Sequence, residues 1–232
     1  LAALRRGRPM RLLQAASNAA MLADGAHVRA SEGATPTLLS RIAEFDHSRA
    51  VPAKFEAAAE LLRAMGPDEK SVVWTNYIRN LDSFARYMTE VTDMAVFQVD
   101  GRVPARPITA ESDASDDDES REAVIAGFLR HPGKAVLVTN PASCSESISL
   151  HSACRNAIYL DRTYDCAQWL QSIDRIHRLG LPPDAQVRVH VLRATLSGEP
   201  TIDHLVAASL AGKESRMMQL LEGAALSPIH AE

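Results

Sequence analysis

The chain contains little cysteine and no long apolar run. Its 232 residues include three cysteines, an odd number, and none of them stands in a C-x-x-C pair (Cys144, Cys154, Cys166). That pattern argues against a disulfide framework and a zinc site, so we expect no metal ligands, and it favours a reducing compartment. The chain also lacks a secretory signal and a membrane-spanning segment. We therefore expect a cytoplasmic protein without a membrane partner.

Positive charge is not in excess, so composition gives no general sign of nucleic-acid binding. The net charge is -4, but seven acidic residues lie within Glu111–Glu122, where Arg121 is the one base. The remaining 24 basic and 22 acidic residues nearly balance, which permits a local phosphate-binding strip without proving one. The range Arg102–Ser120 is rich in Pro, Ser and Asp and cannot bury enough apolar surface to order itself. It is expected to be a mobile acidic loop.

Two catalytic motifs are absent as well. The phosphate loop G-x-x-x-x-G-K-[ST] is missing, because Gly133-Lys134 and Gly212-Lys213 are followed by neither Ser nor Thr. This chain alone is therefore not expected to bind and hydrolyse ATP. No G-x-S-x-G elbow exists, and Ser149 and His151 have no evident third partner, so a serine hydrolase is disfavoured. Asp161, which ends the run YLD, is read as a strand-end aspartate rather than a magnesium ligand.

Strand and helix patterns alternate along the chain. Short apolar runs predict five strands, and periodic segments between and around them predict helices. The strands are expected at Lys70–Asn76, Ala95–Val99, Ala135–Thr139, Ala157–Leu160 and Val187–Leu192. The helices are expected within residues 1–25, from Thr35-Pro36 through Phe45, and at Ser48–Met65, Ile78–Glu90, Arg121–His131 and Thr201–Glu222. This alternation predicts an α/β fold with a mainly parallel, doubly wound sheet.

The segment Ala167–Gly180, AQWLQSIDRIHRLG, combines an apolar and a basic face. At about 100° per residue, Gln171, Arg175 and Arg178 share one side of a predicted helix. The opposite side is apolar and suited to burial (Trp169, Leu170, Ile173, Ile176). Gly180 and the prolines that follow would end the helix. An arginine pair at this spacing is commonly a solvated face, but its planar donors also suit a polyphosphate.

The letters QSIDRIHRLG resemble the last conserved motif of superfamily-two helicases, in the form found in Swi/Snf-type DNA translocases. That motif reads roughly Q-x-x-[DG]-R-x-x-R-x-G-Q, and this chain departs from it at Leu181. The matching positions are Gln171, Asp174, Arg175, His177, Arg178 and Gly180. The resemblance implies that Arg175 and Arg178 are arginine fingers for the γ-phosphate and that Gln171 donates a hydrogen bond in the ATP cleft.

Three further segments resemble the family's motifs in order: Lys70–Met88, Phe97–Gly101 and Ala135–Ala153. In the first, Thr75 and Asn76 stand where a polar strand end faces the nucleic-acid backbone. In the third, Thr139 and the SISL echo (Ser147–Leu150) remain, but serines replace the usual glycines and the segment is about two residues longer. Serine hydroxyls can donate to phosphate, so the resemblance implies contacts to nucleic acid from Thr139, Ser147 and Ser149.

The resemblance covers roughly Arg8–Glu222 and implies the C-terminal RecA-like lobe of an ATP-dependent DNA translocase or helicase. Residues 1–47 would be a helical lead-in and residues 48–232 the lobe, with its acidic loop directed away from DNA. ATP and Mg²⁺ would be held mainly by an N-terminal lobe of the same parent protein, and double-stranded DNA would be the nucleic acid. The motif variants resemble stand-alone bacterial members, and the start at Leu1 suggests a fragment. A catalytically inactive RecA-like interaction module remains the alternative.

Overall fold

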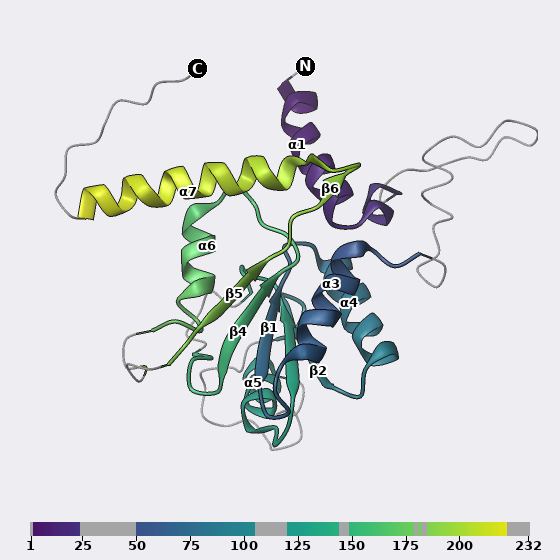
Figure 1. The fold of residues 1–232 in the computed structure, drawn as a ribbon, viewed down its shortest axis with the longest axis vertical. Helices are drawn as coiled ribbons and strands as arrows, with labels where there is room; N and C mark the ends of the chain where they lie inside the picture. The colour runs from purple at the N-terminus through teal and green to yellow at the C-terminus, as the bar shows by residue number, and fades with distance from the viewer. Residues whose placement is uncertain are drawn as a thin grey trace, which may run out of the picture.

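The computed structural model describes residues 2–23, 50–104, 120–143, 149–178, 181 and 185–221. Within these ranges helices and strands alternate along the chain (Figure 1). The helical elements are α1 (Ala2–Ser17), the 3₁₀ helix η1 (Ala19–Ala23), α3 (Ala53–Ala64), α4 (Ile78–Val91), α5 (Arg121–Arg130), α6 (Cys166–Ile173) and α7 (Ile202–Leu221). The strands are β1 (Lys70–Trp74), β2 (Ala95–Val99), β3 (Ala135–Thr139), β4 (Cys154–Tyr159), β5 (Arg188–Val191), β6 (Thr195–Leu196) and β7 (Glu199–Pro200).

Five strands form one parallel sheet in the order β2-β3-β1-β4-β5, which confirms the predicted fold class. The predictions for β2 and β3 were correct at both ends. Strand β4 begins at Cys154, three residues before the predicted start, because Cys154 pairs with Lys70 across a register shift next to Ser71. The hairpin of β6 and β7 was not predicted, since strands of two residues carry no periodic signal.

Helices cover both faces of the sheet, as a doubly wound arrangement requires (Figure 1). On one face, apolar side chains of α3 and α4 pack against alternate strand residues such as Val73, Val138 and Ile158. On the other, side chains from α5 and the α6 segment pack against the intervening residues, including Trp74 and Tyr159. Two aromatic rings reinforce this second core, with the Trp74 and Tyr159 centroids 6.2 Å apart. The central strands β1 and β3 are therefore buried on both sides, which explains their nearly continuous apolar sequences.

The first and last helices pack together beyond the end of the sheet toward which the strands run. Leu13 of α1 lies against Val206 and Leu210 of α7, and all three side chains are buried. Helix α7 crosses this end of the molecule, and its C-terminal part extends past the sheet (Figure 1). No helix in the described ranges is long and apolar enough to cross a membrane.

The predicted helix over Ala167–Gly180 was wrong in its second half. Helix α6 ends at Ile173, and residues 174–176 form a turn in which the His177 N–H still bonds the Ile173 carbonyl. The Arg175 carbonyl accepts the Leu150 N–H instead of serving a longer helix, and periodicity within the segment carries no trace of this long-range bond. Gly180, the residues around Thr35-Pro36 and most of the acidic loop lie outside the described residues.

Candidate functional site

Polar side chains meet at the carboxyl end of the sheet, where β1, β3 and β4 finish. Asp161, two residues after β4, is 3% exposed and accepts five hydrogen bonds on its side chain. The Thr75 hydroxyl donates to it at 2.7 Å and the Asn76 backbone N–H also at 2.7 Å. The other donors are the Asn76 amide at 3.1 Å, Ser17 at 3.0 Å and Asn80 at 3.3 Å. Asp161 thereby fastens α1, β1 and α4 to the end of β4.

This network bears on two predictions from the sequence: that Asp161 is a strand-end aspartate, and that Thr75 contacts nucleic acid. Because donors surround the Asp161 carboxylate, it holds structure together and is not free to bind Mg²⁺, as the strand-end interpretation requires. In the described part of the chain, no group of three potential metal-ligating side chains is found. Thr75 is fully buried and its hydroxyl is committed to Asp161, so in this conformation it positions Asn76 and does not itself face a phosphate.

The end of β3 supplies a second polar turn beside Asn76. The Thr139 hydroxyl is buried and donates to the Val99 carbonyl at 2.7 Å, so it joins β3 to β2. The next residue, Asn140, donates to the Asn76 carbonyl at 3.3 Å and accepts from the Ala142 N–H at 2.7 Å. Asn76 and Asn140, both partly exposed, are the amides that this end of the sheet offers to a ligand.

The arginine turn lies at the opposite, amino end of the sheet. Helix α6 starts after the carboxyl end of β4 and runs back, so that the Arg175 carbonyl meets the Leu150 N–H at 2.9 Å, just before β4 begins. Ile176 is fully buried in the core of this face together with Leu150. Burial of Ile176 fixes the backbone between the two arginines, while Gln171 and Arg178 are exposed and Arg175 is partly exposed. The predicted division into an apolar and a basic side is therefore present, on a helix followed by a turn.

The described parts of the predicted serine segment lie at opposite ends of the sheet. Asn140 is at the carboxyl end, where β3 finishes, and Leu150 is beside the arginine turn. Ser149 lies at this second end, where its hydroxyl is 2.6 Å from His151 Nδ1. The structure thus separates Ser149 from Thr75 and Asn76, with which the sequence had grouped it. Ser147 lies outside the described residues.

Charged groups at the carboxyl end are held in defined pairs. Arg102 contacts Asp100 at 2.7 Å and Asp82 at 2.5 Å, just before the acidic loop. Its hydrogen bonds hold the pKa of the buried Asp100 carboxyl below its usual range. Arg162 lies over the Trp169 ring, 4.6 Å from its centroid. Burial, together with repulsion from Arg193, lowers the pKa of Arg162.

Sequence reasoning missed some polar residues of this end. Asn140 directly follows a predicted strand, and that position could have indicated it. Arg193 gave no such signal, because it is an isolated charge in sequence, and nothing in the sequence indicates which charge Lys54 meets. Lys54 is nevertheless 5% exposed and lies 2.7 Å from Asp203, which begins its own helix far along the chain. Only the tertiary fold brings these two charges together.

Comparison with known proteins supports the fold. No family model and no curated protein matches the chain. Among solved structures, the C-terminal part of the Fun30 ATPase domain is similar, with a TM-score of 0.55 and 18% sequence identity. The similarity covers 74% of this chain and 50% of that one, so the chain spans about half of the neighbour's length. T4 UvsW gives a TM-score of 0.47 at 8% identity, covering 70% of this chain and 32% of that one. A TM-score this low does not establish a shared fold. The first likeness, with the five-stranded parallel sheet, shows that this chain has a RecA-like α/β fold.

Proposed function

We propose that this chain is the C-terminal lobe of an ATP-dependent DNA translocase or helicase. The observation that carries the proposal is the anchored arginine turn. Ile176 is buried and the Arg175 carbonyl is bonded to Leu150, so Arg178 and Gln171 face outward from a fixed backbone at the amino end of a RecA-like sheet. Guanidiniums carried on a fixed backbone at a rim suit a nucleotide that is held mainly by another lobe.

The residues present fit the phosphate end of ATP but not its metal ion. Arg175 and Arg178 offer permanent positive charge and planar donors, and Gln171 adds an amide from the preceding helix. Preorganised arginines stabilise the charge that develops on a transferring phosphoryl group. Asp161 is committed to protein donors, so Mg²⁺ would be held by carboxylates of the N-terminal lobe.

In this proposal the residues at the carboxyl end of the sheet contact DNA. The partly exposed amide of Asn140 would contact the backbone of a duplex, and Asn76, whose amide nitrogen donates to Asp161, would hold Asn140 in place through its carbonyl. Thr75 and Thr139 would act behind them, by fixing the strand ends through buried hydrogen bonds.

The test is DNA-stimulated ATP hydrolysis by a protein that carries both lobes. Arg175→Ala and Arg178→Ala should each lower the hydrolysis rate, by about 10³-fold or more if arginine fingers here act as in other phosphoryl-transfer enzymes. Arg86→Ala, which removes an exposed arginine from α4 on the other face of the sheet, should leave the rate unchanged. Undiminished hydrolysis in either of the first two variants would remove the assignment and favour an inactive interaction module.

A further inference from the structure

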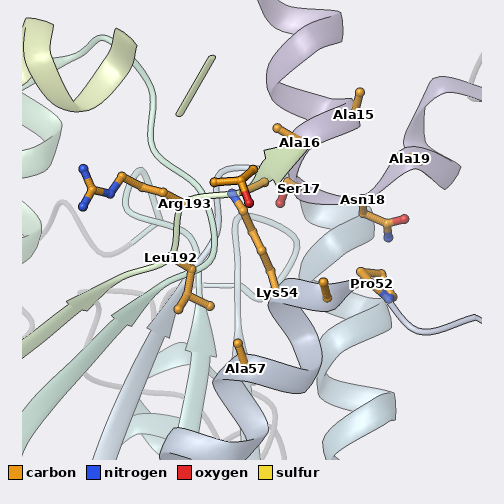
Figure 2. Close-up of a pocket in the computed structure, with 13 residues that line it drawn as sticks. Ala15, Ala16, Ser17, Asn18, Ala19, Pro52, Lys54, Ala57, Leu192 and Arg193 are labelled. Carbon is orange, nitrogen blue, oxygen red and sulfur yellow. The ribbon is translucent and has the colours of Figure 1, made fainter. Parts of the chain in front are cut away.

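A cavity of about 460 Å³ opens at the carboxyl end of the sheet, away from the amides described above. Three segments enclose it: the end of α1, the start of α3 and the residues that follow β5 (Figure 2). Much of its wall is alanine, as at Ala15, Ala53 and Ala57. Such a wall has no side-chain hydrogen-bonding groups or aromatic rings with which to recognise a base. The polar groups of the cavity therefore determine what it can bind.

The first of these polar features is the start of α3. This helix has twelve residues, and its N-cap, Pro52, provides no side-chain acceptor for the first turn. The N-terminus of a helix carries partial positive charge and presents N–H groups to anions. A residue such as Ser or Asp at the N-cap would normally satisfy part of this demand. At α3 no N-cap side chain accepts from the first-turn N–H groups, so a ligand in the cavity would have to supply the acceptor.

The second feature, independent of the first, is a pair of buried donors that line the cavity. The Asn18 side-chain nitrogen has no hydrogen-bond partner, and Asn18 is 2% exposed. The Lys54 side chain extends from α3 across the cavity toward the end of α1 (Figure 2). Its ammonium lies 2.7 Å from Asp203, yet the contact lacks hydrogen-bond geometry. At that distance the two groups form an ion pair, so the Asn18 nitrogen is the donor of this pair that lacks an acceptor. Buried donors without acceptors are costly, and an anion would supply acceptors.

Charge at the rim favours the same kind of ligand. Arg193 lines the cavity and is exposed, and it is close enough to Arg162 to help lower the pKa of that group. The Arg193 guanidinium extends away from Lys54 and Asn18 (Figure 2), so its charge lies at the rim and not inside the cavity. The acidic groups nearby are Asp203, which pairs with Lys54, and Glu56, which is exposed on the first turn of α3. The Lys54 charge is thus balanced by Asp203, and Arg193 supplies the exposed positive charge of the lining.

We propose that this cavity, at the start of α3 beside Asn18, binds a backbone phosphate of the DNA. The inference rests on the proposed function and adds to it a second contact with DNA. The cavity lies at the same end of the sheet as Asn76 and Asn140, and opposite the arginine turn. Ser17, which lines it, is bonded to Asp161 and so ties it to the amide site.

The decisive variant is Ala53→Asp. Ala53 is exposed in the first turn of α3 and lines the cavity. A carboxylate there stabilises the helix N-terminus, so the thermal midpoint should be equal to or above that of the wild-type protein. The same carboxylate repels phosphate, so affinity for a DNA duplex at low salt should fall about tenfold, and the slope of log K against log salt should become shallower by about one. Ala53→Asn, which has the same shape without the charge, is the matched control.

A second variant tests the rim. Arg193→Gln should lower DNA affinity and the salt slope in the same way, whereas Arg130→Gln, at the far end of α5, removes an equal charge from the amino end and should change neither. If the wild-type chain binds duplex DNA and Ala53→Asp binds equally well, this inference is overturned while the proposed function stands. If the wild-type chain binds no DNA even at low salt, the DNA role in the proposed function is overturned, and the cavity assignment with it.

Discussion

At the scale of single residues, the surroundings of Asp161 in the fold decide whether its carboxylate is a metal ligand or a structural group. In the sequence it ends an apolar run, a place where a magnesium ligand or a structural acid would look the same. In the structure, donors from four residues fill its acceptor positions. A carboxylate bonded in this way organises its neighbours and does not meet a substrate. The amide nitrogen of Asn76 is bonded to Asp161 as well, so this carboxylate sets the position of the whole Asn76 side chain.

Removing the Asp161 carboxylate should therefore damage the fold. Asp161→Ala leaves the buried hydroxyls of Ser17 and Thr75 without their acceptor, which should lower the free energy of unfolding by about 3 kcal/mol or more. Urea denaturation followed by circular dichroism measures this change. A well-folded Asp161→Ala protein of unchanged stability that has lost only metal affinity would show instead that Asp161 is a metal ligand.

Asp100 gives a second prediction at this scale, one that depends on pH. Because hydrogen bonds from Arg102 lower its folded-state pKa, the contribution of Asp100 to stability is complete above the unfolded pKa of about 4. That contribution is lost as pH falls through the lower folded value. Asp100→Asn should thus lower the free energy of unfolding by about 1 kcal/mol at pH 7. The difference from wild type should shrink below about pH 4, and a constant difference down to pH 2 would exclude this ion pair as its source.

At the scale of elements, the sequence predicted nearly everything that local pattern can encode. The five strands, and helices such as α4 and α5, were found close to their observed limits. Helix α3 starts at Ala53, later than predicted, because a residue before proline is biased toward extended backbone, and Val51 precedes Pro52. The exposed side that carries Gln171 and Arg178 was recognisable from spacing, and their role as site residues stays a prediction from the motif resemblance. The end of α6 was not, because the bond between Leu150 and Arg175 joins distant segments, and the cavity at α3 was not, because its charges meet only in the fold.

Helix α6 is short, so its N-terminal cap should have a measurable effect. Asp165 accepts the Gln168 N–H at 3.0 Å, and this bond starts the helix that leads to the arginine turn. Asp165→Ala should lower the free energy of unfolding by about 1 kcal/mol and increase amide hydrogen exchange in residues 166–173. Asp165→Ser retains a cap and should restore both. Unchanged exchange in Asp165→Ala would mean that packing of Trp169 and Ile173 alone holds the helix.

At the scale of the whole molecule, two groups of residues occupy opposite ends of one parallel sheet. Amides and the α3 cavity lie at the carboxyl end, and the arginine turn lies at the amino end. Because helices pack on both faces of the sheet, it serves as a rigid spacer. In the proposed function, DNA and the nucleotide therefore contact separate surfaces of a single lobe.

The most direct test is ATP hydrolysis by the two-lobed protein, measured as a function of duplex DNA concentration. Arg178→Ala should abolish the rate reached at saturating DNA while leaving the DNA affinity of the protein unchanged. Ala53→Asp should shift half-maximal stimulation to about tenfold higher DNA concentration and reach the same final rate. Two results would contradict this proposal. Either both variants change the same quantity, the maximal rate or the DNA concentration at half-maximal stimulation, or Arg178→Ala hydrolyses ATP at the wild-type rate. In either case, the assignment of ATP hydrolysis to one end of the sheet and DNA binding to the other is wrong.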